Sequence, residues 1–153
     1  NGQKVLIYGA SGSIGTSAVQ IAKSFGAEVT GVCSTGNLEM VKSLGADKVI
    51  DYTKDDITEC TETWDLVLDA VRKWKSSDLK TQCRNALAPK GKYISVDDGS
   101  PNATLEHLNL LREMVEAKKL KPVIDRTWPL EEMVEAHRYV DKGHKKGNVI
   151  IHI

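Results

Sequence analysis

The chain has 153 residues, of which 41% are hydrophobic, and this is enough for one globular domain with a sizeable core. Lysine plus arginine and aspartate plus glutamate number 21 each, so the net charge favours neither nucleic acid nor a membrane surface as a partner. No apolar run approaches the roughly 18 residues of a membrane-spanning helix, and no signal peptide is recognisable.

The first residues and the cysteines indicate the setting of the chain. It begins with Asn1-Gly2 rather than Met, as we expect of a piece of a longer polypeptide or of a processed end. Its three cysteines, Cys33, Cys60 and Cys83, are odd in number, far apart and without a Cys-x-x-Cys pair. This usage predicts reduced thiols in a cytoplasmic or similar compartment, and neither a disulfide framework nor a zinc site.

The first segment predicts a strand, a tight turn, a helix and a second strand. The short apolar run Lys4–Tyr8 is followed at once by Gly9-Ala-Ser-Gly12-Ser-Ile-Gly15, in which the glycines are three residues apart. From there the apolar residues recur with a helical period as far as Phe25, and Glu28–Cys33 is again apolar and β-prone. The segment therefore forms a complete β-α-β unit.

The glycine-rich turn is the strongest functional signal. At the carboxyl end of a parallel strand, such a turn presents free N–H groups and the positive end of a helix dipole. Gly9 allows the turn, Gly12 lets a pyrophosphate approach the backbone, and Gly15 lets the helix pack against the strand. We therefore predict dinucleotide binding by these residues: Gly9, Ala10, Ser11, Gly12, Ser13, Ile14 and Gly15.

An alternative remains open for this turn. Its first glycine spacing is one residue longer than in the commonest dinucleotide fingerprint. The glycines could also serve only to close the helix onto the sheet of an α/β domain that binds nothing.

The following segments alternate between helix and strand. Helices are expected at Asn37–Leu44 and 79–87, and strands at Lys48–Asp51, Trp64–Ala70 and Lys92–Val96, with a loop or a turn of helix at Asp55–Thr63. Pro89 and Gly91 are expected to separate the second helix from the last of these strands. The order predicts an α/β fold with a doubly wound parallel sheet of about five to six strands.

A cluster of turn formers, Asp97-Asp-Gly-Ser-Pro-Asn102, marks the best boundary. It divides the chain into a dinucleotide-binding core, residues 1–99, and a helix-strand-helix-strand segment, residues 102–153. We expect the elements of this segment as follows: a helix over Thr104–Lys119, a short strand over Lys121–Arg126, a helix over Leu130–Asp141 with Pro129 as its first residue, and a strand over Val149–Ile153.

Four separated motifs resemble the medium-chain dehydrogenase/reductase superfamily. They are the Gly9–Gly15 turn, Ser43-Leu-Gly-Ala-Asp-Lys-Val-Ile-Asp-Tyr52, Trp64-Asp-Leu-Val-Leu-Asp69-Ala, and the stretch from Leu130 through Ala136-His137-Arg138 to Gly143-His-Lys-Lys-Gly147. They occur in the family's order over nearly the whole chain. Within the superfamily the likeness is to the quinone-oxidoreductase-like, zinc-independent branch, which is related to the zinc-type alcohol dehydrogenases.

The resemblance implies a Rossmann domain of an NADP(H)- or NAD(H)-dependent oxidoreductase. In the family a larger catalytic domain precedes this domain, and the stretch matching residues 102–153 folds back onto it. We expect this chain to be without that N-terminal catalytic domain. The family also carries a further helix and a sixth strand just before the helix near Thr104. Without them, Lys92–Val96 becomes a sheet edge unless Pro122–Asp125 or Val149–Ile153 covers it.

The end of the second strand favours NADP(H) over NAD(H). NAD-selective domains place an acid there, and positions Gly31 to Asn37 contain none. Cys33, Ser34 and Thr35 are small, and the hydroxyls of Ser34 and Thr35 could donate to a 2′-phosphate, although ordinary turn chemistry explains these two residues about as well.

A positive charge is missing from this position. The family's NADP-binding members usually carry Lys or Arg where Gly36 and Asn37 stand here. Lys42, Lys54 and Tyr52 are candidate substitutes, and Tyr52 matches a family tyrosine near the adenosine ribose.

The nicotinamide side of the crevice is expected at the ends of the fourth and fifth strands, because ligands bind at the switch point of such sheets. The residues there are Asp69, Ala70, Val71, Ser95 and Val96. Asp69 could equally cap its own loop.

No catalytic residue and no metal ligand can be assigned. The histidines His107, His137, His144 and His152 are scattered. The basic groups Lys118-Lys119-Lys121 and His144-Lys145-Lys146 are best explained as exposed helix ends. No tyrosine has a lysine four residues on, as short-chain reductases require, and no Gly-x-Ser-x-Gly elbow of a hydrolase is present.

The sequence thus predicts the NADP(H)-binding domain of an oxidoreductase that transfers hydride to or from a quinone, enone or carbonyl, and the chain alone is expected to bind without turnover. The alternative is a non-catalytic dinucleotide-binding sensor or interaction module. The expected partners are a nicotinamide dinucleotide and the missing catalytic domain, with a homodimer left open and with neither nucleic acid nor a membrane span.

Overall fold

The computed structural model describes residues 2–55, 57, 62–71, 78–99 and 102–153. Its strands are β1 (Lys4–Tyr8), β2 (Glu28–Cys33), β3 (Lys48–Asp51), β4 (Trp64–Asp69), β5 (Leu87–Ser95), β6 (Ile124–Pro129) and β7 (Asn148–His152). Its α-helices are α1 (Ser13–Ser24), α2 (Leu38–Ser43), α3 (Asp78–Asn85), α4 (Leu105–Glu116) and α5 (Met133–Asp141). Short 3-10 helices, η1 (Thr35–Asn37) and η4 (Leu130–Glu132), precede α2 and α5.

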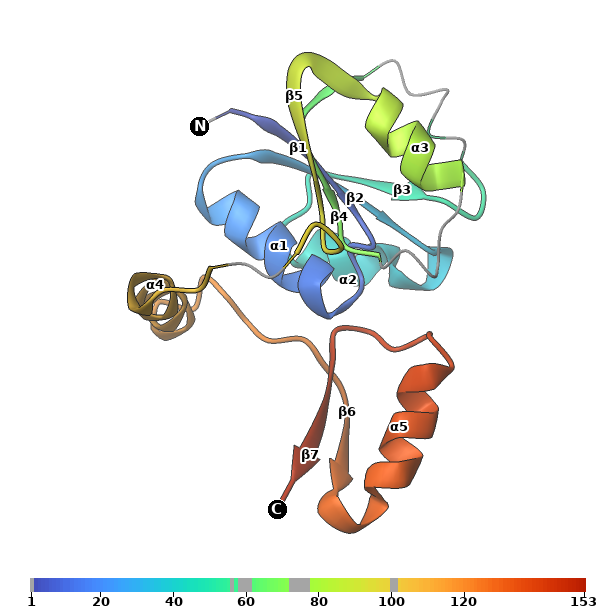
Figure 1. The fold of residues 1–153 in the computed structure, drawn as a ribbon, viewed down its shortest axis with the longest axis vertical. Coiled ribbons are helices and arrows are strands. Elements are labelled where there is room, and N and C mark those ends of the chain that lie inside the picture. The colour runs from blue at the N-terminus through green and yellow to red at the C-terminus, as the bar shows by residue number, and fades with distance from the viewer. Residues whose placement is uncertain (1, 56, 58–61, 72–77, 100–101) are drawn as a thin grey trace.

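The first five strands form one parallel sheet in the order β3-β2-β1-β4-β5, which confirms the predicted Rossmann-type fold (Figure 1). Tyr8, the last residue of β1, is paired with Val32 on one side and with Asp69 on the other. The carboxyl ends of the central strands therefore meet at the same edge of the sheet, which is where such folds bind their ligands.

Two apolar layers hold this sheet between helices. Val5 and Ile7 of β1 pack into a cluster with Val19 of α1 and Val41 of α2. Leu6 and Tyr8, which point to the opposite face, pack into a second cluster with Trp64 of β4 and Cys83 of α3. Burial on both faces explains why these strands read as continuous apolar runs.

The fifth strand differs from its prediction. β5 begins at Leu87, five residues before the expected start at Lys92, so Pro89 and Gly91 lie inside a strand. The pairing register with β4 shifts at this point, and a Cβ on Gly91 would lie 2.8 Å from the carbonyl oxygen of Trp64. Proline and glycine are tolerated because β5 is an edge strand with an irregular register.

The C-terminal segment contains a second, smaller sheet in which β6 and β7 pair in parallel. The sequence predicts Pro129 as the first residue of a helix, but β6 extends to Pro129, so this residue ends a strand. Its φ of −69° is compatible with either position. Since β6 and β7 pair with each other, neither of the two segments proposed to cover β5 does so.

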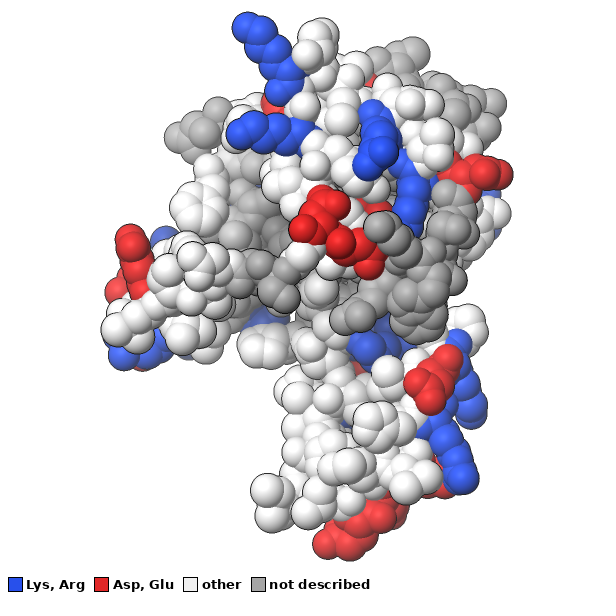
Figure 2. Space-filling model, in the orientation of Figure 1, with Lys and Arg blue, Asp and Glu red and all other residues white. Residues whose placement is uncertain are grey.

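Helix α4 begins at a capping box in which Thr104 and His107 exchange hydrogen bonds. Figure 1 shows it apart from the five-stranded sheet, and the unit built from β6, α5 and β7 lies on the side where α1 begins. None of the described helices is long and apolar enough to cross a bilayer. Figure 2 shows Lys and Arg interspersed with Asp and Glu on the visible face.

Candidate cofactor site

The glycine-rich turn lies over the end of β2 and beside the loop that follows β4. The backbone N–H groups of Gly9 and Ala10 both donate to the carbonyl oxygen of Val32, at 3.1 Å. Gly9 has a φ of +81°, and a Cβ there would lie 2.7 Å from Cγ2 of Val71. Position 9 therefore requires glycine for both its conformation and its space.

The other two glycines of the turn differ in what the protein demands of them. A Cβ on Gly15 would lie 2.1 Å from the carbonyl oxygen of Gly9, so only glycine lets α1 start this close to the turn. Gly12 has an ordinary φ of −81°, and a Cβ there would meet only the carbonyl oxygen of Gly9, at 3.5 Å. Neither the conformation nor the packing of the described residues requires glycine at position 12.

The start of α1 offers backbone donors that the helix itself does not use. Gly12 is the N-cap residue, and among the described residues no side chain caps the helix there. The N–H of Thr16 donates to the carbonyl oxygen of Gly12 and so makes the first intrahelical bond. The N–H groups of Ser13, Ile14 and Gly15 precede that bond and have no partner within the helix. Together with the helix dipole, they form a site that suits an anion.

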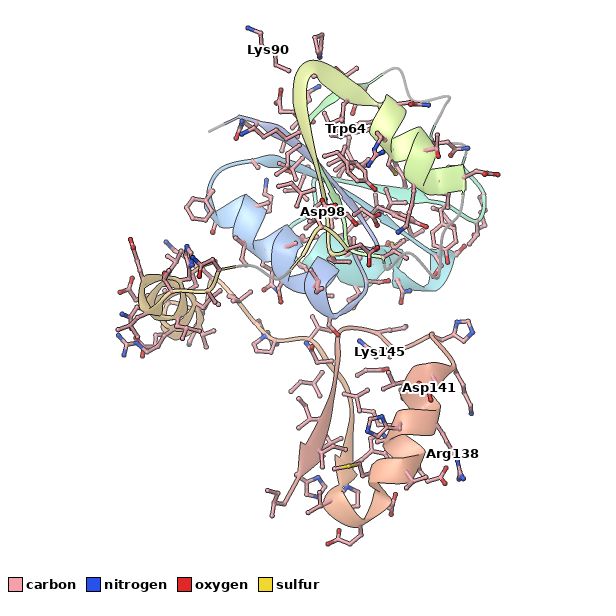
Figure 3. The ribbon with its side chains drawn as sticks, in the orientation of Figure 1. Trp64, Lys90, Asp98, Arg138, Asp141 and Lys145 are labelled. Carbon is pink, nitrogen blue, oxygen red and sulfur yellow. The ribbon has the colours of Figure 1, made fainter. Side chains whose placement is uncertain are left out.

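A loop from the far end of the chain meets this turn. The N–H of Gly147 donates to the carbonyl oxygen of Ser11 at 2.8 Å, and Gly147 forms a parallel bridge with Gly12. Ser13 Oγ donates to the carbonyl oxygen of Gly147 at 2.8 Å. Lys145 Nζ donates to Ser13 Oγ and to the carbonyl oxygen of Gly147. Figure 3 shows Lys145 between the start of α1 and the β6–α5–β7 unit.

This contact corrects the interpretation of the 144–146 run as an exposed helix end. Lys145 is half-buried, and its ammonium lies at the N-terminal end of α1, where it adds positive charge. Gly147 is the signal that could have located it, because its φ is +55° and a Cβ there would lie 2.4 Å from the carbonyl oxygen of Val123. For Lys118 and Lys119, which are exposed just after α4, the helix-end interpretation describes the structure.

The residues after β2 were predicted to meet the adenosine ribose. Ser34 Oγ accepts a hydrogen bond from Asn37 Nδ2 at 3.0 Å, which leaves the hydroxyl proton to be donated. The Thr35 hydroxyl instead donates to Asp51, a buried residue at the end of β3. This bond, followed in importance by those from Thr53, holds the pKa of the Asp51 carboxyl below its usual value.

Cys33 can contribute only its backbone to this region. Its side chain is 2% exposed, and burial, followed by the charge of Asp51, raises the pKa of its thiol to about 11. Its carbonyl oxygen accepts the N–H of Tyr52 at 3.2 Å, and Tyr52 remains 43% exposed. Cys83 is also buried and free, whereas Cys60 and most of the segment 55–63 lie outside the described residues.

Lys42 and Lys54 were the predicted substitutes for a basic residue at Gly36 and Asn37, but the structure places another lysine at Gly36. Lys42 Nζ lies 3.4 Å from Glu39, and Lys54 Nζ lies 3.9 Å from Asp51. Lys146, which had been assigned to a helix end, donates from Nζ to the carbonyl oxygen of Gly36 at 3.2 Å. No local sequence pattern predicts this contact, because 110 residues separate Lys146 from Gly36.

On the other side of the turn, Asp69 is tied into the protein. Its carboxylate accepts hydrogen bonds from the Val71 N–H at 2.9 Å and the Tyr93 hydroxyl at 2.8 Å, and Lys80 Nζ lies 3.0 Å away. Burial, and then the bond to Asp69, raises the pKa of Tyr93. The alternative interpretation, in which Asp69 caps its own loop, therefore describes its side chain, since the carboxylate accepts the Val71 N–H.

The other residues predicted for the nicotinamide side lie at adjacent strand ends. The N–H of Ala70 donates to the carbonyl oxygen of Tyr8, and Cγ2 of Val71 fills the space that a side chain at position 9 would need. Ser95 is paired with Asp69, and the N–H of Val96 donates to the Asp69 carbonyl oxygen at 3.0 Å. Within the described ranges, no group of three or more His, Cys, Asp or Glu residues could hold a metal ion.

Comparisons with known proteins agree with this arrangement. The family described as zinc-binding dehydrogenase matches residues 13–135. NAD(P)H oxidoreductase RTN4IP1, mitochondrial, from Mus musculus is 32% identical over 194 residues, which cover 99% of this chain and 48% of the mouse protein. The 2-methylene-furan-3-one reductase of Solanum lycopersicum is 35% identical over 164 residues, which cover 99% of this chain and 41% of the tomato protein.

A solved structure extends the agreement to three dimensions. The quinone oxidoreductase from Coxiella burnetii superposes with a TM-score of 0.90 at 28% identity, over 100% of this chain and 53% of that one. The chain thus spans about half the length of the relatives it matches. It belongs to the zinc-binding dehydrogenase family within the medium-chain dehydrogenase/reductase superfamily, and its relatives there are quinone and NAD(P)H oxidoreductases.

Proposed function

We propose that the chain is the NADP(H)-binding part of an oxidoreductase that transfers hydride between the nicotinamide and a quinone, an enone or a carbonyl compound. The observation that carries this proposal is the start of α1, where three N–H groups lie beside a glycine that the protein's own packing does not require. The relatives support the chemistry, since their names include NAD(P)H oxidoreductase, quinone oxidoreductase and a furanone reductase.

The fit of a diphosphate to this end of α1 follows from the residues present. The N–H groups of Ser13, Ile14 and Gly15 supply donors, and Gly12 leaves room for the phosphates to approach the backbone. Lys145 Nζ adds a positive charge at the same place, where it donates hydrogen bonds to Ser13 Oγ and to the carbonyl oxygen of Gly147. A hydrogen bond from a charged ammonium to a phosphate oxygen is stronger than one between neutral groups.

The preference for the 2′-phosphorylated cofactor is the finer part of the proposal. No acid stands between Gly31 and Asn37 to bind a ribose hydroxyl or to repel a phosphate. Ser34 retains a hydroxyl proton, and Tyr52, whose N–H donates to the carbonyl oxygen of Cys33, has an exposed side chain. These features support NADP(H) over NAD(H).

Catalysis is assigned to a part of the protein beyond this chain. A bound nicotinamide supplies or accepts the hydride, while the protein must orient the ring and polarise the substrate carbonyl. The carboxylate of Asp69, at the crevice, is occupied by Val71, Tyr93 and Lys80 and so has a structural role. Because the chain spans about half the length of its relatives, we propose that it binds the cofactor without turning it over.

Titration of the chain with NADPH and with NADH, followed through nicotinamide fluorescence, tests this proposal. We expect saturable binding of NADPH and weaker binding of NADH. Addition of a quinone or an enone to the NADPH complex should leave the NADPH absorbance constant. Failure to bind either cofactor contradicts the proposal, equal or tighter binding of NADH contradicts the preference, and steady consumption of NADPH contradicts the assignment of catalysis to another part.

The reading frame that encodes the chain supplies a second test. A catalytic domain encoded directly upstream supports the oxidoreductase. Cofactor binding with no such domain would instead make the chain a non-catalytic sensor or interaction module.

A further inference from the structure

We infer that Lys146 recognises the 2′-phosphate of NADP(H) and so replaces the basic residue that is missing directly after β2. The inference rests on the proposed function and names a residue that sets the cofactor preference. Its basis is the contact between Lys146 Nζ and the carbonyl oxygen of Gly36, at 3.2 Å.

Gly36 marks the place where a 2′-phosphate would lie. In folds of this type the adenosine ribose lies at the carboxyl end of the second strand, and β2 ends at Cys33. Gly36 is exposed, and a Cβ built on it would have no atom within 4 Å. The space above this segment is therefore open to a ligand, and the ammonium of Lys146 lies at its border.

The backbone around Lys146 is held in place. Its N–H donates to Asp125 Oδ2 at 3.1 Å, and the next residue, Gly147, is bonded to Ser11 in the glycine-rich turn. The side chain is exposed and reaches from this anchor to Gly36. An ammonium has three donors, so one bond to the Gly36 carbonyl leaves two for phosphate oxygens.

The neighbouring charges favour Lys146 over the other lysines near this segment. Lys42 faces Glu39, and Lys54 faces the buried Asp51, so each is partly neutralised by an acid. The negative charge of Asp51 is itself met by the hydroxyls of Thr35 and Thr53 and by Lys54. Lys146 Nζ bonds a neutral carbonyl there and forms no ion pair with a described residue, although its charge also acts on Asp125 and helps to lower the pKa of that carboxyl.

Two adjacent lysines thus face two different parts of the same ligand. Lys145 lies at the start of α1, next to the diphosphate that NADPH and NADH share. Lys146 lies beside the segment after β2, where only NADPH carries a phosphate. Removal of each ammonium should therefore have a different effect on the two cofactors.

The test compares Lys146→Met with Lys145→Met in the full chain, with affinities for NADPH and NADH measured by fluorescence titration. We expect Lys146→Met to weaken NADPH binding about tenfold or more, as the loss of a charge-assisted hydrogen bond would, and to leave NADH binding within about twofold. Lys145→Met should weaken both cofactors by similar factors. Lys146→Arg should keep the preference for NADPH.

Adenosine 2′,5′-bisphosphate and AMP, which differ only in the 2′-phosphate, provide the same comparison without the nicotinamide. Lys146→Met should reduce the difference between these two ligands. Thermal unfolding of each variant shows whether the fold is retained, which we expect for Lys146→Met because that side chain is exposed.

The outcomes separate this inference from the proposed function. If the unchanged chain binds neither cofactor, both fail. If it prefers NADPH and Lys146→Met keeps the same preference, the inference alone fails. An equal loss of NADPH and NADH affinity in Lys146→Met also overturns it, because Lys146 would then contact a part common to both.

Discussion

Two strand-helix-strand units of the same local topology occur in this chain, and they differ in burial. In the first, β1, α1 and β2, four of the five residues of β1 are buried, as are five of the six residues of β2. In the second, β6, α5 and β7, no residue of either strand is buried, and Ala136 is the buried residue of the helix. The strands of both units run parallel.

The difference follows from what surrounds each unit. β1 lies in the middle of five strands with helices on both faces, whereas β6 and β7 form a sheet of two strands covered by one helix. A two-stranded sheet is only marginally stable by itself. The second unit also leaves Ile124 55% exposed and Val134 62% exposed. A local pattern can thus specify strands and helices while their burial depends on further partners.

That residues 102–153 pack on a catalytic domain stays a prediction, and the exposed apolar side chains are what such a packing would bury. The first unit, in contrast, is built into the core of the five-stranded sheet, and its glycine-rich turn is held by Val32 at the end of β2 and by the loop at Gly147.

Equivalent substitutions in the two units should give the largest contrast. Ile7 of β1 is 1% exposed and Ile150 of β7 is 38% exposed. Ile7→Ala should lower the free energy of unfolding by about 3 kcal/mol, because it leaves a cavity in a packed core. Ile150→Ala should cost less than about 1 kcal/mol, because less apolar area is lost. Denaturant unfolding measures both, and equal losses would mean that the second unit is as well packed as the first.

A second contrast lies within the first unit. Gly15→Ala should destabilise the chain by about 2 kcal/mol, since its Cβ would fall 2.1 Å from the Gly9 carbonyl oxygen and force the turn to shift. Gly12→Ala is the matched control. It should change stability by less than about 0.5 kcal/mol, as is usual for positions without such a conflict. Thermal unfolding compares the two, and a stable Gly15→Ala variant would show that α1 is not held against the turn.

The contrast between the units also explains how much could be predicted from the sequence. The strand, turn and helix of residues 4–25 follow from glycine spacing and apolar period, both of which are local. The alternation of strands and helices up to Ser95 predicted a parallel, doubly wound sheet, which the structure confirms. The prediction and the structure agree here because the residues that are apolar in the sequence of the first unit are also the buried ones.

The errors arose where a distant contact decides the structure. The sequence predicts that Pro89 and Gly91 break the chain before the fifth strand, but β5 contains both because it is an edge strand with an irregular register beside Trp64. The Thr35 hydroxyl is directed to Asp51, sixteen residues away, which no local pattern indicates. Lys145 reaches the start of α1, and Lys146 reaches Gly36 in η1, only because the loop after α5 returns to the glycine-rich turn.

The ion pair that ties α1 to the strands should give the smallest effect. Lys23 Nζ lies 2.8 Å from Asp47, and the Val29 N–H donates to the same carboxylate at 2.7 Å. The bond from Lys23 lowers the pKa of Asp47 in the folded chain, so the folded state resists protonation more than the unfolded state does. The stabilisation is therefore present at neutral pH and declines as the pH falls below about 4.

Asp47→Asn should cost less than about 1 kcal/mol at neutral pH, because the two side chains are 33% and 38% exposed and water screens the pair. The difference between the variant and the unchanged chain should shrink as the pH is lowered, and denaturant unfolding at several pH values measures it. A difference that grows in acid would contradict the assigned direction of the pKa shift.

The central claim is that the start of α1 binds a diphosphate, and Gly12→Asp tests it most directly. Ser24→Asp is the control, because it places the same charge at the other end of the same helix, where Ser24 is exposed. In fluorescence titrations with NADPH, we expect Gly12→Asp to lose more than about tenfold in affinity through repulsion of the phosphates, with thermal unfolding showing a retained fold. We expect Ser24→Asp to bind NADPH like the unchanged chain. A folded Gly12→Asp variant that keeps full affinity would contradict the claim.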